Sequence, residues 1–250
     1  MTSSPMIHDD GAARADRSAD AAAHPSAVLT RRYVDALDYT AILHATQVRK
    51  GSTIPYMSHL LAVSAAVLES GGTETEAIAG LLHDAAEDQG GAVRLADIRV
   101  RFGDEVAHIV AGCTDSWSQD AAAKDPWCRR KSAYVAHLLD PQTSRGTLLV
   151  AACDKLHNAA SLLADARQYA NPGDFWRGRF SSTPAQAAWY YRSCLDAFVA
   201  RELPPVLLTR LTGTTDDLVA LIDTIPTADR GEVSGCLRNP AAACADCGAA

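Results

Sequence analysis

Apolar residues recur every three or four positions along most of the chain, the spacing that places them on one face of an α-helix. Val34, Leu37, Ala41 and Val48, for example, follow this spacing near the start of the chain. No stretch shows the strict alternation of apolar and polar residues that is typical of a half-buried strand. The pattern therefore predicts an all-α fold.

Glycines and capping residues divide the pattern into separate helices. Thr73 and Glu76 have the spacing of a capping box, which predicts that a helix begins there. The helices are expected at about residues 30–51, 58–71, 73–88, 95–102, 104–113, 126–139, 144–169, 184–202 and 215–224. The sequence thus predicts a single all-α domain of roughly eight or nine helices, with no internal repeat.

The two ends of the chain differ from its middle in composition. All fifteen aromatic residues fall between Tyr33 and Phe198, and residues 1–28 contain eight alanines and no aromatic. Residues 226–250 are rich in Ala, Gly and Cys. Such segments bury too little apolar surface to offset the entropy lost on ordering. We therefore expect a domain over residues 29–225 between disordered tails at 1–28 and 226–250.

The net charge argues against whole classes of partner. The chain has 23 basic and 30 acidic side chains, a net charge of −7, whereas a protein that coats nucleic acid or a membrane surface needs a basic excess. No apolar run approaches the ~20 residues that span a bilayer, and no secretory leader is evident. The seven cysteines are an odd number at scattered positions, which favours a reduced compartment. We expect a cytoplasmic protein.

The C-terminal cysteines could suggest zinc. Cys236, Cys244 and Cys247 lie close together, but a closed zinc site needs four ligands and no fourth ligand is near. We interpret them as incidental thiols.

The helix expected over residues 73–88 carries the most informative polar cluster. His83 and Asp84 follow two leucines, and Glu87 and Asp88 come one turn later, so all four are expected along one edge of the helix. Imidazole and carboxylate groups together suit Mn²⁺, Fe²⁺ or Zn²⁺. A His-Asp pair alone is more often simply solvated. Four polar groups that interrupt an apolar face favour a metal site with an adjacent base.

Two further residues could complete this site. His59 begins the second expected helix, and Asp154 ends the apolar run at residues 148–153. A carboxylate in such a place is costly to bury unless it is paired or binds a metal. The alternative for Asp154 is an ion pair with Lys155 or Arg145.

Taken together, motifs in five regions resemble the hydrolase domain of the RelA/SpoT superfamily. They are Arg49-Lys50-Gly51, the segments 55–59 and 83–88, residues 102–103 with 112–115, and Asp154-Lys155-Leu156-His157-Asn158. The resemblance covers residues 30–200 in the family's order. It is closest in extent to the stand-alone small alarmone hydrolases, a group with metazoan members, and it implies an HD-type helical domain.

The resemblance also implies roles for individual residues. One divalent metal, usually Mn²⁺, would be held by His59, His83, Asp84 and Asp154. The attacking water would be positioned and activated by Glu87 and Asp88. The substrate would be contacted by Arg49, Lys50, Asn158, Ser161 and Tyr190. Further cations that could face a polyanionic substrate are Lys131 and Lys155, although for Arg130 and Lys131 a solvated helix face is the alternative.

The reaction implied is hydrolysis of the 3′-pyrophosphate of ppGpp or pppGpp to pyrophosphate and GDP or GTP. Two alternatives keep the fold and metal but change the substrate, to NADPH or to pyrophosphorylated tRNA; in the latter case the chain would be an antitoxin with a toxin partner. A third alternative is a catalytically silent nucleotide-binding module, against which the intact Glu87-Asp88 pair argues.

Three residues depart from the family pattern without removing a ligand: Leu60, Gln89 and Cys153. Gln89 borders the catalytic pair, so the departure concerns substrate preference more than metal binding. Among the remaining histidines, we interpret His44 as structural, His108 and His137 as helix-face residues, and His157 at most as support for a ligand.

Overall fold

The computed structural model describes residues 28–118, 124–233 and 237. Within them it contains twelve helices, and its only β-type pairing is one isolated bridge between Val48 and Pro55. The first six helices are α1 (Arg31–Leu43), α2 (Met57–Glu69), α3 (Glu74–Leu82), α4 (Ala85–Asp88), α5 (Gly91–Phe102) and α6 (Asp104–Cys113). The others are α7 (Trp127–Leu139), α8 (Arg145–Ala166), α9 (Gly173–Trp176), α10 (Pro184–Ala200), α11 (Pro205–Asp223) and α12 (Thr227–Arg230). The predicted all-α fold is confirmed.

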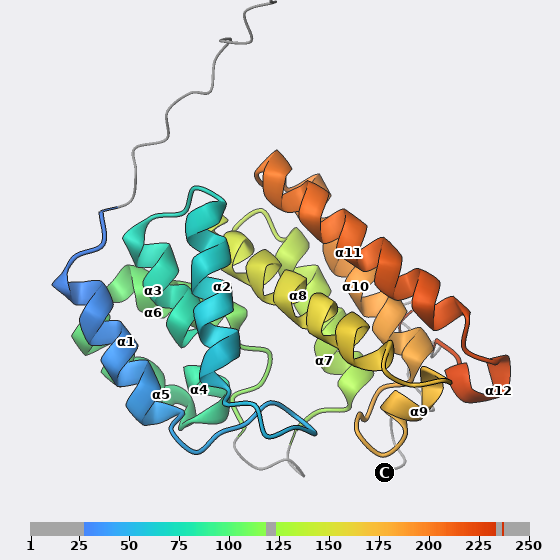
Figure 1. The fold of residues 1–250 in the computed structure, drawn as a ribbon. Helices are drawn as coiled ribbons and strands as arrows, with labels where there is room; N and C mark the ends of the chain where they lie inside the picture. Colours follow the sequence, from blue (N-terminus) through green and yellow to red (C-terminus); the bar gives the residue numbers. More distant parts are fainter. Residues whose placement is uncertain (1–27, 119–123, 234–236, 238–250) are drawn as a thin grey trace, which may run out of the picture.

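Helix α8 is the centre of the molecule. It begins at Arg145, after the N-cap Ser144, whose side chain accepts a hydrogen bond from the backbone N–H of Thr147, and its first half is buried from Thr147 to Asp154. Helices α2, α3 and α6 pack on one side of it, and α10 and α11 pack on the other (Figure 1). This burial on all sides explains why residues 148–153 are all apolar. The next residue of the helix, Asp154, therefore lies in the interior.

Two apolar clusters hold the helices together. The larger one includes the space between α2, α3, α6 and the first half of α8, and it extends to residues of α1, α4, α5, α7, α10 and α11. The second surrounds Phe175 and Trp176 and joins α9 to the end of α8 and to α10 and α11. The metal ligands described below come from α2, from the end of α3 and from α8, so the larger cluster fixes their spacing.

The first helix is shorter than expected. It ends at Leu43 rather than at Gly51, and the following segment turns back on itself through the bridge between Val48 and Pro55. Gly51 has a positive φ of 71°, which glycine adopts at little cost, and Pro55 has no N–H to continue a helix. The helical spacing of Val48 therefore does not reflect helix formation.

The last long helix begins earlier than expected. Helix α11 starts at Pro205 and not at residue 215, because the fixed φ of proline suits the first helical position and Leu207 and Leu211 are buried. One further turn, α12, and the buried side chain of Leu237 lie beyond residue 225. Residues 1–27, 234–236 and 238–250, including Cys236, Cys244 and Cys247, lie outside the described residues.

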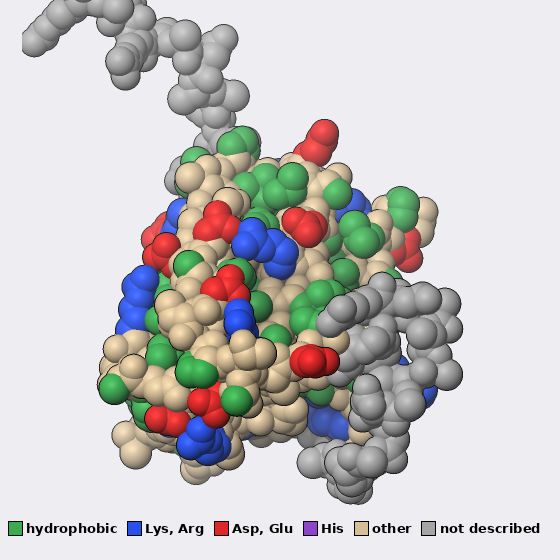
Figure 2. All heavy atoms as spheres, turned by 90° about the vertical axis from the view of Figure 1, so that its right-hand side faces the viewer, with side chains coloured by type: hydrophobic (Ala, Val, Ile, Leu, Met, Phe, Trp, Pro, Cys, Tyr) green, Lys and Arg blue, Asp and Glu red, His purple; other side chains and the backbone are tan. Residues whose placement is uncertain are grey.

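None of the helices in the described ranges is both long and apolar enough to cross a membrane. On the face seen in Figure 2, basic and acidic side chains are interspersed over the part of the chain that the structure describes. Of the cysteines in those ranges, Cys113, Cys153 and Cys194 are free.

Candidate metal centre

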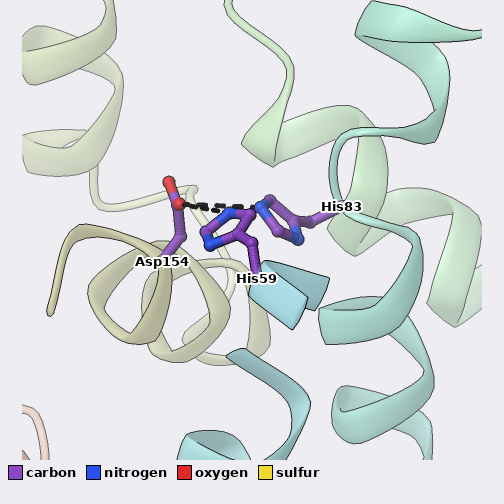
Figure 3. A group of neighbouring side chains, drawn as sticks. All are labelled: His59, His83 and Asp154. Carbon is purple, nitrogen blue, oxygen red and sulfur yellow. Dashed lines mark ion pairs between the residues drawn. The ribbon is translucent and has the colours of Figure 1, made fainter. Parts of the chain in front are cut away.

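Three buried side chains from three different helical segments meet at one point (Figure 3). His59 lies in the first turn of α2, His83 directly follows α3, and Asp154 lies in the middle of α8. Their exposed fractions are 0%, 2% and 7%. One ligand atom from each lies within 4.8 Å of the others, so the three could hold one metal ion.

The atoms that face this point are two ring nitrogens and two carboxylates. Oδ1 of Asp154 lies 3.2 Å from Nε2 of His59 and 3.6 Å from Nε2 of His83. Oδ2 of Asp84 lies 3.0 Å from Nε2 of His83 and 3.6 Å from Nε2 of His59. The structure thus brings together all four residues that the resemblance implies as ligands.

The histidines are oriented as metal ligands would be. Nδ1 of His83 lies 2.8 Å from the carbonyl oxygen of Gly80, which can only accept, so Nδ1 carries a hydrogen, and in the neutral ring Nε2 offers the lone pair. Nε2 of His59 and Nε2 of His83 are buried and make no hydrogen bond. Buried polar atoms without a partner are costly, and a divalent cation would satisfy both. The donor set therefore fits such an ion.

The charges of the cluster are tightly coupled. Burial lowers the pKa of His83, but the carboxylates of Asp84 and Asp154 outweigh it and raise the pKa well above its ordinary value. Burial raises the pKa of Asp154, but Lys155 and the two histidines outweigh this effect and hold the carboxyl pKa well below its usual range. A cation that enters this site must displace a proton.

Asp154 is held by two neighbours on its own helix. Lys155 Nζ donates to Oδ2 at 2.5 Å, and Asn158 Nδ2 donates to Oδ1 at 2.5 Å. Lys155 is largely buried and lies over the rings of Tyr134 and Tyr190, with its ammonium 5.3 and 5.6 Å from the ring centroids. The expected ion pair and the ligand geometry of Asp154 thus occur together.

Glu87 and Asp88 do not lie on the same helix as His83, contrary to expectation. Helix α3 ends at Leu82 and α4 begins at Ala85, because Asp84 adopts φ −94° and ψ −5°, outside regular helical geometry. The turn directs Asp84 to the metal cluster and starts α4 anew. Glu87 and Asp88 remain beside the cluster on the separate α4.

The environment of Glu87 suits a proton acceptor near neutral pH. Burial, together with the negative charges of Asp115 and Asp84, raises its pKa to about 7. Lys124 Nζ lies 3.2 Å from Oε1 and opposes this shift.

Sequence reasoning missed Gln47, which connects three polar residues. Its Nε2 donates to Oδ2 of Asp88 at 2.7 Å, and its Oε1 accepts from Nε2 of Gln89, also at 2.7 Å. Nδ1 of His44 lies 2.7 Å from the same Oε1 and therefore donates to it. His44 is buried and acts through Gln47, consistent with a structural role, and Gln89 contributes to the same network.

The residues expected to contact the nucleotide form two groups. Arg49 Nη2 donates to Oδ1 of Asn158 at 2.9 Å, which connects Arg49 to the partner of Asp154. The Lys50 ammonium lies over the ring of Phe180, 5.2 Å from its centroid. Ser161 is half-buried on α8, one turn beyond Asn158.

The second group surrounds Asp115 and Tyr190. Arg130 Nη1 lies 2.7 Å from Oδ1 of Asp115, and Lys131 pairs with Oδ2. The exposed fractions of the two basic side chains are only 17% and 19%, so they do not form a solvated helix face. Tyr190 is buried with its hydroxyl unpartnered, and the Lys131 ammonium lies 5.0 Å from its ring centroid. Lys131 and Tyr190 are therefore adjacent.

Comparison with known proteins gives related but much longer chains. A protein of Mycobacterium leprae named probable GTP pyrophosphokinase is 36% identical over 121 residues, which cover 48% of this chain and 14% of that protein. A Synechocystis protein named probable guanosine-3′,5′-bis(diphosphate) 3′-pyrophosphohydrolase is 28% identical over 149 residues, 59% of this chain and 18% of that protein. The chain thus spans less than a fifth of the length of these relatives.

A solved structure has the same fold. It is the structure of a metazoan ortholog of SpoT that is described as hydrolysing ppGpp. The two structures align with a TM-score of 0.59 and 23% sequence identity, and the alignment covers 76% of this chain and 96% of the metazoan chain. The sequence also matches the HD domain family over residues 36–173, more than half of its length. HD domains bind divalent metals, and His59, His83 and Asp154 form a possible site of that kind. The chain belongs to the HD domain family and resembles its RelA/SpoT-type members.

Proposed function

We propose that the chain is a Mn²⁺-dependent hydrolase that removes the 3′-pyrophosphate of ppGpp or pppGpp, releasing pyrophosphate and GDP or GTP. The observation that carries the proposal is the arrangement of His59, His83, Asp84 and Asp154 around one point. The names of the two relatives support a guanine nucleotide as the substrate class, and that of the Synechocystis relative names the same reaction. Because substrate and products are guanine nucleotides, we propose the cytoplasm as the place of action.

Mn²⁺ suits this site because its donors are a mixture of imidazole nitrogens and carboxylate oxygens. When bound, such an ion supplies positive charge to the phosphoryl oxygens and lowers the pKa of the attacking water. The protein's own contribution is orientation. Lys155 and Asn158 hold Asp154, and the Tyr56 hydroxyl donates to Oδ2 of Asp84 at 2.5 Å.

Glu87 and Asp88 are the proposed proton acceptors for the attacking water. A general base works best when its pKa lies near the working pH, and the pKa of Glu87 is raised to about 7. Asp88 is held by Gln47. This division gives one carboxylate that exchanges protons at neutral pH and one that is fixed by a hydrogen bond.

We assign the remaining contacts by their charge and position. Arg49, Lys50 and Asn158 are proposed to contact the nucleoside, where the planar guanidinium of Arg49 could stack on guanine. Lys131, Tyr190 and Ser161 are proposed to face the phosphates. Lys155 acts on the substrate through Asp154, since its ammonium is paired with that carboxylate.

The test is product analysis with ligand variants. Purified protein supplied with Mn²⁺ is expected to release pyrophosphate from ppGpp, and His83→Ala and Asp154→Ala are expected to reduce the release to background. His108→Ala and Asp196→Ala, which alter exposed residues of the same types, are expected to leave it unchanged. Retained activity in both ligand variants would contradict the site. Phosphate release from NADPH without turnover of ppGpp would contradict the substrate.

A further inference from the structure

The rings of His59 and His157 contact each other through the same atom of each ring, Nδ1. Nδ1 of His59 on α2 lies 2.8 Å from Nδ1 of His157 on α8, and the ring centroids are 4.8 Å apart. A neutral imidazole carries its hydrogen on only one of its two nitrogens. A hydrogen bond at this distance therefore requires a hydrogen on one Nδ1 and a lone pair on the other.

The position of His59 in the cluster decides the direction of this bond when a metal is present. Its Nε2 faces Oδ1 of Asp154 and Oδ2 of Asp84 and makes no hydrogen bond. To bind a cation, Nε2 must offer a lone pair, so the ring hydrogen must be on Nδ1. Nδ1–H of His59 then donates to Nδ1 of His157, and the hydrogen of His157 is on its Nε2.

We infer that His157 is a positioning residue for the metal centre: its Nδ1 accepts the Nδ1–H of His59 and fixes His59 in the tautomer and orientation that direct the Nε2 lone pair at the ion. The inference rests on the metal assignment within the proposed function but on no particular substrate.

The second histidine ligand shows the same arrangement with a different acceptor. Nδ1–H of His83 donates to the backbone carbonyl of Gly80 at 2.8 Å. Each histidine ligand thus has one hydrogen-bond acceptor at Nδ1, the ring nitrogen that does not face the metal. This is the common arrangement around metal-bound imidazole. The acceptor for His83 belongs to the backbone, whereas the acceptor for His59 is a side chain that substitution can remove.

His157 is placed to support the cluster rather than to join it. Its Nδ1 is turned to His59, and the ring lines a cavity of about 480 Å³ between α2, α8 and α11, with Ala62, Cys153 and Arg210. The ring is half-buried, between the cluster and that cavity. This position on the outer side of His59 agrees with a supporting contact.

Two substitutions of His157 distinguish the effect of losing the acceptor atom from the effect of losing the imidazole ring. Asn places Oδ1 as many bonds from the backbone as Nδ1 of histidine, so His157→Asn can keep the acceptor, whereas His157→Leu cannot. Mn²⁺ binding to metal-stripped protein, measured by titration calorimetry, is expected to weaken about 10- to 100-fold in His157→Leu. His157→Asn is expected to bind close to wild type, and His108→Leu is the control. Equal weakening in the Asn and Leu variants, or none in Leu, would overturn the inference.

A direct measurement of the tautomer does not depend on any variant. In ¹⁵N-labelled wild-type protein loaded with Zn²⁺, NMR is expected to show the hydrogen on Nδ1 of His59 and on Nε2 of His157. A hydrogen on Nδ1 of His157 would overturn the inference, even if His157→Leu fails to fold. If wild-type protein binds no divalent cation, the metal assignment itself fails; if it binds one and His157→Leu binds equally well, only the role of His157 fails.

Discussion

The side-chain amide of Gln47 donates from Nε2 to Oδ2 of Asp88 at 2.7 Å, across 41 residues of sequence. Burial and Asp84 raise the pKa of Asp88, and this hydrogen bond opposes them. We therefore expect Gln47→Leu to shift the acid limb of the pH–rate profile to higher pH and to lower kcat by about tenfold or more.

The measurement for Gln47→Leu is steady-state kinetics between pH 5.5 and 9. Gln168→Leu, which changes an exposed glutamine at the end of α8, is the control and should leave the profile unchanged. An unshifted acid limb in Gln47→Leu would mean that Gln47 does not act on Asp88.

Glu87 should make the metal-free chain less stable at alkaline pH. Its pKa is raised from an ordinary 4.5 to about 7, so the folded state binds the proton more tightly than the unfolded state. Ionisation of Glu87 therefore destabilises the folded state. This destabilisation is absent below pH 4.5, grows between these two pKa values and is complete above pH 7. Glu87→Gln removes it, so we expect stabilisation by about 1–3 kcal/mol at pH 8 and little change at pH 4.5. Urea unfolding in EDTA measures the difference, and an equal effect at both pH values would refute the explanation.

Binding of Mn²⁺ should release protons. The carboxylates of Asp84 and Asp154 outweigh burial and raise the pKa of His83, which favours the protonated form of this ring in the metal-free protein. A cation needs its neutral form. The affinity is therefore expected to rise from pH 6 to pH 8. Calorimetry in buffers of different ionisation enthalpy measures the protons released, and a binding enthalpy that is the same in all buffers would contradict the expectation.

Lys155 should matter more for stability than an exposed basic residue. Its ion pair with Asp154 is 12% and 10% exposed, and removal of one partner from a buried pair leaves an uncompensated charge. We expect Lys155→Met to lower the unfolding free energy of metal-free protein by about 3 kcal/mol. Arg210→Met removes a pair with Glu69 that is 46% and 61% exposed, and is expected to cost less than about 1 kcal/mol. Equal costs in urea unfolding would argue against a buried pair.

Local signals predicted most of the fold. The capping box of Thr73 and Glu76 forms as expected, with both of its hydrogen bonds. The prediction failed at Leu43 and Leu82, where the helices end although the apolar spacing continues. At both places the chain follows tertiary contacts: the bridge from Val48 to Pro55 in the first case, and the direction of Asp84 into the cluster in the second.

The candidate ligands could be proposed from sequence because His83 and Asp84 interrupt an apolar face and Asp154 follows an apolar run. Gln47 could not be found in this way, and for His157 the sequence indicated at most support for a ligand without showing that the ligand is His59. The contacts of Gln47 with Asp88 and of His157 with His59 join residues that are 41 and 98 positions apart, and neither residue type is unusual at its position. Only the packing of α2 against α8 brings His157 to His59.

The most direct test of the account is a Mn²⁺ titration of metal-stripped protein with ppGpp as substrate, followed by pyrophosphate release. The account predicts no release without metal and full activity at one bound ion per chain, with GDP as the other product. Hydrolysis of ppGpp that is undiminished in the stripped protein, or no pyrophosphate at any Mn²⁺ concentration, would contradict it.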